Sequence, residues 1–174
     1  MQSFVQYLSK YAAYHRDKRN IATHYVGVPM IVAGVATLLS RPAFTYVDGV
    51  AISPALIAVA ITAIFYLKLD IRFGIVMSVF LAACLWLGQT LAVQTTAIWL
   101  SWGIGVLAVG WVIQFIGHYF EGKKPAFVDD IMGLIIGPIF VAAELAFELG
   151  LRKDVQDAVE ARVGPTFIRQ ATVA

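Results

Sequence analysis

The sequence is poor in charged residues and has one cysteine. Of its 174 residues, 14% are charged and 60% are hydrophobic, and the mean hydropathy is +0.78. Soluble domains contain about half apolar and about a quarter charged residues. A water-soluble chain of this length could not bury so much apolar surface in one core. We therefore expect a single membrane-embedded domain, with lipid as the solvent for the excess apolar surface.

The sequence lacks other features as well, and their absence excludes further classes of protein. The lone cysteine, Cys84, excludes an internal disulfide and a cysteine-rich metal site, and its place in an apolar run predicts a small buried side chain. The net charge of +2 is too small to indicate nucleic acid binding. Residues 1–24 contain four basic residues but no continuous apolar core, so they do not resemble a signal peptide. We find no phosphate-binding glycine loop, so the glycines of the apolar runs are predicted to be helix-packing sites.

Four long apolar runs predict the membrane core. They cover residues 26–39, 50–67, 71–93 and 97–120. A bilayer core needs about 17–25 helical residues. The last three runs satisfy this length, whereas the first must borrow residues from His24 upward or lie among its neighbours. Because lipid cannot solvate unpaired backbone groups, the spans must be helical. The predicted fold class is therefore all-α, a multi-pass transmembrane helix bundle with four spans.

The segments that flank this core are predicted to be helices outside the four spans. Residues 3–19 have apolar side chains at three- and four-residue spacing, which predicts an amphipathic helix on the membrane surface or across the bundle. The run 131–149 carries Glu144 and Glu148 on one helix face, which would be costly against lipid. We expect an interfacial or re-entrant C-terminal helix there, with a fifth span as the alternative. A short exposed helix at 154–162 should end at the following Gly-Pro.

These segments divide the one domain into four parts. They are an amphipathic N-terminal segment (1–24), a four-helix transmembrane core (25–120), a loop with the interfacial or re-entrant helix (121–151) and a cytoplasmic tail (152–174). Lys and Arg are concentrated before the first run, between the second and third runs and after the fourth. Because such positive segments stay in the cytoplasm, we expect the N-terminus on that side. A bacterial inner membrane or an endoplasmic reticulum membrane would fit.

The chain has three histidines, His15, His24 and His118, and the four-span topology brings all of them to the cytoplasmic face. His15 and His24 are nine residues apart, so on one continuous helix they would point in opposite directions. They can share a metal only if the chain breaks between them, and Asn20 is a suitable helix N-cap at such a break. His118 and Glu121 are three residues apart and share a helix face. Imidazole and carboxylate suit iron, manganese or zinc, so these three histidines and Glu121 are candidate ligands.

Each candidate also has a plain structural interpretation. A lone histidine near an interface is commonly an amphipathic anchor, Glu121 could be a solvated helix-end charge, and Glu144 and Glu148 could pair with basic residues. A different membrane metalloenzyme, such as a hydrolase or a desaturase-like oxidase, therefore stays open, as does a non-enzymatic transporter or metal-handling or assembly protein. Desaturase-type proteins need many more histidines. A transporter should carry ionisable residues in mid-membrane, where the four main runs have none.

Two motifs resemble a known family. In residues 14–29, Tyr-His is followed by four residues and Asn, by three residues and His, and by two residues and Gly-x-Pro. Residues 114–121 read Gln-Phe-Ile-Gly-His-Tyr-Phe-Glu and precede Lys-Pro-Ala at 124–126. Both strings resemble the membrane family of 2-hydroxy fatty acid dioxygenases, whose eukaryotic members work in the endoplasmic reticulum in phytosphingosine breakdown. The resemblance extends over nearly the full chain, with the motifs in the expected order.

The resemblance implies a reaction and a cofactor. Members of this family are Fe(II)-dependent and use O2 to shorten a 2-hydroxy fatty acid by one carbon, with release of CO2 and without 2-oxoglutarate. The expected partners are therefore a 2-hydroxy fatty acid, O2 and the lipid bilayer. By position, His15, His24 and His118 match the motif histidines and are the expected iron ligands. Glu121 is expected either to coordinate the iron or to orient a ligand.

The resemblance also implies residues that surround the metal. Tyr14, Asn20 and Gln114 lie in the motifs and are expected to orient the ligands or to position the substrate. Separately, nearby cationic groups are candidates for steering the substrate's carboxylate, with ordinary positive-inside charge as the competing explanation; they are Arg16, Lys18, Lys123 and Lys124. The acyl chain is expected to stay between the helices or in the leaflet while the 2-hydroxy-carboxylate head reaches the metal.

Overall fold

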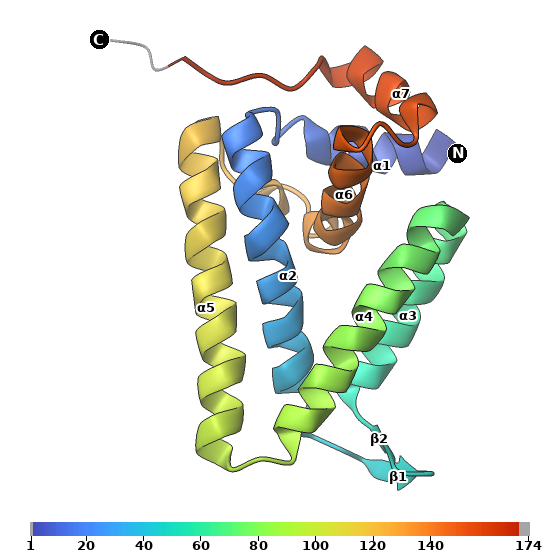
Figure 1. The fold of residues 1–174 in the computed structure, drawn as a ribbon, viewed down its shortest axis with the longest axis vertical. Coiled ribbons are helices and arrows are strands. Elements are labelled where there is room, and N and C mark those ends of the chain that lie inside the picture. Colours follow the sequence, from blue (N-terminus) through green and yellow to red (C-terminus); the bar gives the residue numbers. More distant parts are fainter. Residues whose placement is uncertain (1, 171–174) are drawn as a thin grey trace.

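Residues 2–170 form a bundle of helices with one small β-hairpin (Figure 1). The computed structural model describes residues 2–170. In chain order its elements are α1 (Gln2–Ala12), α2 (Lys18–Ser40), β1 (Thr45–Val47), β2 (Val50–Ile52), α3 (Pro54–Leu69), α4 (Ile71–Ala92), α5 (Thr96–Glu121), the 3-10 helix η1 (Ala126–Val128), α6 (Met132–Glu148) and α7 (Lys153–Val163). The predicted helical class is confirmed, with the hairpin as its exception.

Within the described residues, three helices are long and apolar enough to cross a membrane: α2, α4 and α5, with 23, 22 and 26 residues. A fourth span is counted only if α6 and α7, which meet at a bend of 111°, form one broken span. Helix α3 is apolar but has 16 residues, fewer than the roughly 17–25 that a bilayer core requires. The predicted span at 50–67 is wrong at its start, because residues 50–52 form β2 and the helix begins at Pro54. The number of spans stays a prediction.

The first membrane helix begins earlier than its apolar run predicts. Helix α2 starts at Lys18 because Asp17, in an extended conformation, caps it, and the Asp17 carboxylate accepts the backbone N–H of Arg19 at 2.9 Å. The prediction that Asn20 caps this helix is wrong, since Asn20 is buried inside the first turn. The first turn of α2, which begins at Lys18, is polar, and with this turn included the helix has 23 residues. The short apolar run thus becomes a helix of full length.

Helices α2 and α5 run side by side (Figure 1) and approach closely at glycines. A Cβ on Gly27 would lie 2.9 Å from the carbonyl oxygen of Gly110, and a Cβ on Gly110 would lie 3.0 Å from that of Gly27. At Gly117 a Cβ would collide with the side chains of Asn20 and Thr23. Small residues allow helix backbones to come this close. The predicted packing role of these glycines is confirmed, and it holds the start of α2 against the end of α5.

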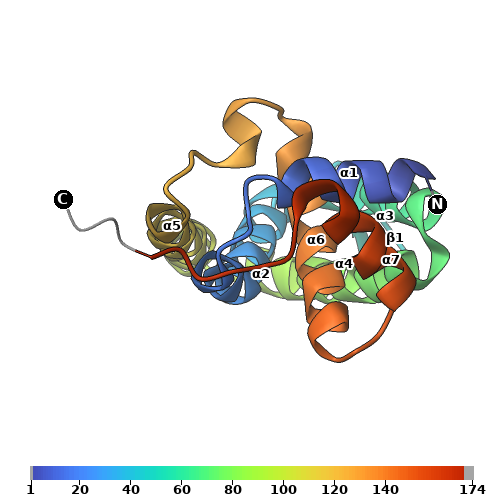
Figure 2. The ribbon, with the colours of Figure 1, turned by 90° about the horizontal axis from the view of Figure 1, so that it is seen from above.

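Helices α1, α6 and α7 gather at one end of the bundle, and α1 and α7 lie across α6 when this end is viewed from above (Figure 2). Phe4 and Leu8 of α1 are buried in the same apolar cluster as residues of α6, as the amphipathic pattern predicts. The predicted helix at 154–162 is present as α7. It is not exposed on all sides, because Val155 and Val159 are buried in that cluster.

Helix α6 forms the segment predicted to be interfacial or re-entrant. Most of its residues from 136 to 144 are buried. Figure 1 shows that the connection after α5 passes down beside the bundle, and that α6 then returns to the end where α5 finishes. The choice between an interfacial helix, a re-entrant helix and part of a span stays a prediction.

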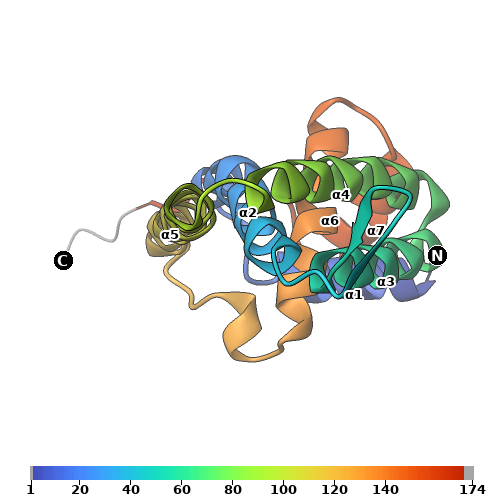
Figure 3. The same cartoon turned by 90° about the horizontal axis from the view of Figure 1, so that it is seen from below.

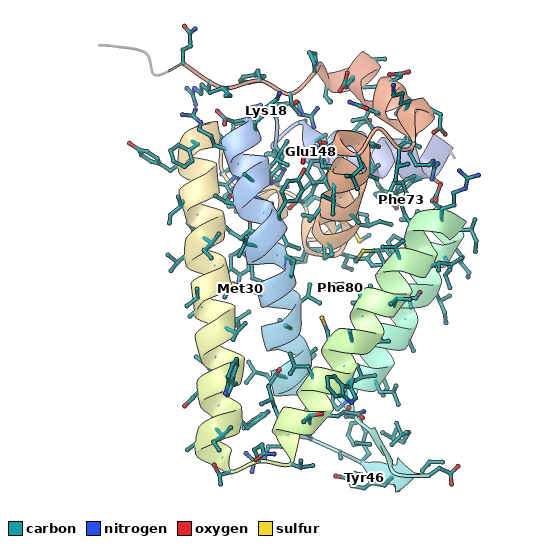
Figure 4. All side chains as sticks on the ribbon, viewed as in Figure 1. Lys18, Met30, Tyr46, Phe73, Phe80 and Glu148 are labelled. Carbon is teal, nitrogen blue, oxygen red and sulfur yellow. The ribbon has the colours of Figure 1, made fainter. Side chains whose placement is uncertain are left out.

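The hairpin of β1 and β2 lies at the opposite end of the molecule, beside the start of α3 (Figures 1 and 3). Its antiparallel strands are joined by Asp48 and Gly49, both with positive φ, which is the backbone of a tight hairpin turn. Figure 4 places Tyr46 at this end and Lys18 and Glu148 at the other.

Candidate metal centre

The three histidines meet at the end of the bundle where α2 and α5 join α1 and α6. Their ring centroids lie 4.6 Å apart for His15 and His24, 5.0 Å for His15 and His118, and 5.3 Å for His24 and His118. Each can offer one ring nitrogen such that these atoms all lie within 4.8 Å of one another. All three side chains are buried. The predicted convergence of these residues at one end of the bundle is confirmed.

Three different elements supply these side chains. His15 lies in the connection between α1 and α2, His24 lies on α2, and His118 lies in the last turn of α5. The interruption of helix that shared ligation requires is therefore present. It ends at Asp17, the cap of α2, and not at Asn20 as predicted.

Backbone carbonyls orient two of the rings. His15 Nδ1 lies 2.8 Å from the carbonyl oxygen of Tyr11, and His24 Nδ1 lies 2.8 Å from that of Asn20. A proton on each Nδ1 can be donated to the carbonyl, which leaves the Nε2 lone pair free to bind a metal. Among residues 2–170, His15 Nε2 and His118 Nδ1 are buried without a hydrogen-bond partner. The rings are thus held in the form that metal ligands need.

His15 is also held in the neutral state. Burial lowers its pKa well below the ordinary histidine value, and the neighbouring His24 lowers it further. The ring stacks on Tyr11, with centroids 4.1 Å apart and planes within 4° of parallel, and Phe140 lies 5.6 Å away. Only a neutral imidazole can coordinate a metal. The apolar surroundings therefore favour ligation by His15 over protonation.

The donor set fits a transition-metal ion. Buried ring nitrogens without partners are costly, because they lose hydration and gain nothing in exchange. A cation bound by all three would remove that cost. Imidazole suits several metals, iron and zinc among them, and a site with three protein ligands leaves coordination positions open for a substrate or O2.

Glu121 lies beside the histidines, and its carboxylate accepts hydrogen bonds from several N–H groups. The backbone N–H of Arg16 lies 3.0 Å from each carboxylate oxygen, and Oε2 also accepts from the Asp17 N–H at 2.9 Å and from Asn20 Nδ2 at 3.0 Å. This carboxylate therefore ties the end of α5 to the turn that carries His15. Glu121 is not in the group of three possible ligands, and its coordination of a metal stays a prediction.

Arg16 forms a buried ion pair behind the site. Its Nη2 lies 2.9 Å from Glu144 Oε1, and the two side chains are 5% and 9% exposed. Arg16 also donates to the carbonyl oxygens of Ala12, His15 and Gly164. The expectation that Glu144 pairs with a basic residue is confirmed. Because each guanidinium nitrogen of Arg16 already has an acceptor, the geometry argues against its predicted role in steering a carboxylate.

The three residues predicted to assist the ligands lie in different places. Asn20 contacts the site directly, through its carbonyl oxygen and its amide. Gln114 is buried one turn before His118, and neither amide atom has a hydrogen-bond partner in the described chain. The hydroxyl of Tyr14 instead donates to Asp129 at 2.8 Å. The functional roles of these residues stay predictions.

A cavity of about 60 Å³ adjoins the histidines. His24, His118 and Gln114 are among the polar residues of its wall, and Val28 and Pro138 are among the apolar ones. A water molecule needs about 10–15 Å³ of such space. The cavity is therefore large enough for O2 or for the head of a small acid beside the histidine nitrogens.

The segment after α7 closes over this end, and no sequence pattern indicated it. It crosses above α2 toward α5 in Figure 2. Phe167 donates its N–H to the carbonyl of Arg16 and accepts the N–H of Lys18, both at 2.9 Å. Arg169 Nη1 donates to the carbonyl oxygen of Glu121 at 2.8 Å. These contacts brace the turn around His15 from outside the motifs.

The fold and site together define a class: an α-helical protein with membrane-type helices and a buried three-histidine group that could hold a metal. A family model described as 2-hydroxy-palmitic acid dioxygenase Mpo1-like matches residues 1–149, so the chain belongs to this family. It is similar to the 2-hydroxy-palmitic acid dioxygenase MPO1 of Saccharomyces cerevisiae, with 28% identity over 155 residues, which are 88% of this chain and 85% of the relative. No solved structure matches the chain significantly. The family suggested by the two motifs is confirmed.

Proposed function

We propose that this protein is an Fe(II)-dependent dioxygenase that shortens 2-hydroxy fatty acids by one carbon and releases CO2. One observation carries the proposal: three buried imidazoles lie close enough to share a metal ion, and two of them, His24 and His118, line a cavity of about 60 Å³. The family supplies the substrate class, because the yeast relative is named for 2-hydroxy-palmitic acid. Family membership also favours an enzyme over a transporter or a metal-handling protein.

The proposed reaction balances without a second organic substrate. A 2-hydroxy acid and one O2 give the acid one carbon shorter, CO2 and water. The bond between the carboxyl carbon and the hydroxyl-bearing carbon breaks, the hydroxyl-bearing carbon becomes the new carboxyl group, and the old carboxyl carbon leaves as CO2. These two oxidations release the four electrons that reduce O2 completely. The reaction therefore needs neither 2-oxoglutarate nor an external reductant.

Bound Fe(II) would supply O2 activation and coordination of the substrate head. The residues of the chain orient the participants. The carbonyls of Tyr11 and Asn20 fix the rings of His15 and His24 with Nε2 free. The amide of Gln114, unpaired at the cavity wall, is placed to hydrogen-bond the hydroxyl or carboxylate of a 2-hydroxy acid. The apolar remainder of the wall excludes water from the reacting carbons.

A membrane setting suits an amphiphilic substrate. The long apolar helices α2 and α5 carry His24 and His118 at one end, so a fatty acid in one leaflet has its polar head near the level of the site. The distribution of basic residues supports a site on the cytoplasmic side, in a bacterial inner membrane or an endoplasmic reticulum membrane.

Metal analysis and a turnover assay on the purified protein test this function. Protein loaded anaerobically with Fe(II) should consume O2 with 2-hydroxypalmitate and form the acid one carbon shorter without 2-oxoglutarate. Palmitate, which lacks the hydroxyl group, serves as the matched control and should not react. A strict requirement for 2-oxoglutarate, or equal turnover by iron-free protein, would contradict the proposal.

A further inference from the structure

An apolar groove continues from the histidine cavity toward the hairpin end. It holds about 380 Å³, and its wall comes from α2, α3, α4, α5 and α6. The groove and the histidine cavity share five wall residues, namely Ile31, Val32, Trp111, Leu134 and Pro138. The groove therefore begins where the cavity beside the histidines ends.

The groove follows the same helix faces that carry two of the histidines. On α5, the residues that lead from the histidine into the groove are His118, Gln114, Trp111 and Leu107. On α2, they are His24, Val28, Ile31, Val35 and Leu39. Steps of three and four residues keep side chains on one face of a helix. At about 1.5 Å per residue, the distance from His24 to Leu39 is about 22 Å along the helix axis, so the path is long and leads straight from the histidines.

The wall of this groove suits a hydrocarbon chain. None of its lining residues is charged, and the hydroxyl of Tyr66 is already bonded to the carbonyl of Ile135. Val35 and Leu134, both on the wall, are 41% and 44% exposed. The groove is therefore open at its side, where lipid tails surround a membrane helix.

A second cavity near the histidines has a different character. It holds about 310 Å³ between α1 and α6 and meets the histidine cavity at Tyr11, Ala126 and Gly133. Lys10 and Asp130 line it. Charged groups there favour water over hydrocarbon, so the groove along α2 and α5 is the better path for an acyl chain.

We propose that this groove binds the acyl chain of the substrate, with the carboxyl end at the histidines and the methyl end near Leu39, Ala55 and Ala58. This assignment rests on the proposed function for the identity of the polar head. The position of the polar head determines where the acyl chain goes. The carbons that follow the head must leave the histidine cavity, and the groove is the apolar extension of the wall of that cavity.

The far end of the groove should decide which chain lengths fit. Bilayer tails are as apolar as the groove, so moving a chain from lipid into it gains little from the hydrophobic effect. Steric fit must then discriminate. Ala55 and Ala58, near the start of α3, present only methyl groups at this end. In hydrophobic pockets a single methylene changes specificity by about tenfold or more.

Filling the far end tests the assignment. Ala58→Phe is expected to lower kcat/KM for 2-hydroxypalmitate by at least about tenfold and to leave 2-hydroxy acids several carbons shorter unaffected. Ala58→Leu should give an intermediate shift. Ala60→Phe is the matched control, because Ala60 is also an exposed alanine of α3 and does not line the groove. It should keep the wild-type profile.

A photolabel makes the result independent of turnover. A 2-hydroxypalmitate with a diazirine near its methyl end, bound to the wild-type protein without metal, should label the peptides around Leu39 and Ala58, and Ala58→Phe should abolish that labelling. Unchanged chain-length profiles and labelling spread over the lipid-facing surfaces would overturn the groove assignment and show that the acyl chain stays in the bilayer. Groove labelling by a protein that turns over no 2-hydroxy acid would support the groove and refute the proposed function alone.

Discussion

The polar contacts at the two ends of the bundle span different distances along the sequence. At the histidine end, buried polar side chains connect residues more than a hundred positions apart, as in the contacts of Arg16 with Glu121 and Glu144. At the hairpin end, the strands pair with their immediate neighbours in sequence, and Tyr46 is 64% exposed. Buried polar groups are costly unless each finds a partner, so such a network has to specify its geometry closely. Side-chain geometry is therefore most closely specified at the end where the three histidines meet.

The largest effect is expected from removing the histidines themselves. His15→Ala, His24→Ala and His118→Ala should each lose bound iron and lower turnover by at least about a hundredfold, because each removes one of three ligands. Metal content and O2 uptake measure the two losses. Tyr119→Ala, next to His118 but 83% exposed, should change neither. Single histidine variants that keep full iron and full activity would contradict the assignment of the three histidines as metal ligands.

The next effect concerns the buried ion pair. Glu144→Ala leaves the Arg16 guanidinium buried without its carboxylate, which should lower the free energy of unfolding by about 3–5 kcal/mol. Denaturation in detergent, followed by circular dichroism, measures this. Tyr46→Ala at the hairpin end is the contrasting variant and should stay within about 0.5 kcal/mol of wild type. Equal losses in the two variants would show that the ends do not differ.

A smaller effect should follow from Glu121→Gln, which keeps the shape of the side chain and removes its charge. We expect metal affinity to fall by about 10–100-fold, because the carboxylate that accepts from Arg16, Asp17 and Asn20 holds the turn carrying His15. Metal titration below the unfolding temperature measures it. Loss of iron ligation in the spectrum, with the turn intact, would instead indicate that Glu121 is a direct ligand.

The smallest effect is a pH dependence away from the site. Burial raises the pKa of Asp70, but hydrogen bonds from Arg152 and from the N–H groups of Phe73 and Arg72 outweigh it, so the pKa lies below its ordinary value. The stabilisation is therefore fully present above the ordinary Asp pKa of about 3.9 and is lost as pH falls through the folded-state value. We expect less than about 1 kcal/mol.

A comparison of wild type with Asp70→Asn measures this contribution. The difference in unfolding free energy between the two proteins should be constant above about pH 5 and should shrink below about pH 4. A difference that grows toward acid would have the wrong sign for this ion pair.

The sequence predicted the parts of the structure that follow from periodicity and hydropathy. The helices expected at 71–93 and 97–120 appear as Ile71–Ala92 and Thr96–Glu121. The gathering of three histidines at one end was inferred from hydropathy and charge, and the structure brings them together. These features depend on local composition and on the length of a span.

The features that the sequence did not reveal depend on competition or on distant contacts. Both Asp17 and Asn20 are good helix caps, and only the tertiary contacts of Asn20 with Glu121 show why the earlier residue begins α2. The Asp-Gly turn is a recognised signal of a β-hairpin. In the sequence, however, the apolar residues of β2 are continuous with those of α3, so the two elements look like one apolar run. The pair of Arg16 and Glu144 joins residues 128 apart, and no local pattern records such a contact.

X-ray absorption of the Fe(II)-loaded protein, compared with the variant that lacks all three histidines, tests the central claim most directly. We expect iron bound at one site per chain, with imidazole scattering from His15, His24 and His118 in the wild type and no such signal in the variant. Iron bound without imidazole ligands, or an unchanged spectrum when the three histidines are removed, would contradict it.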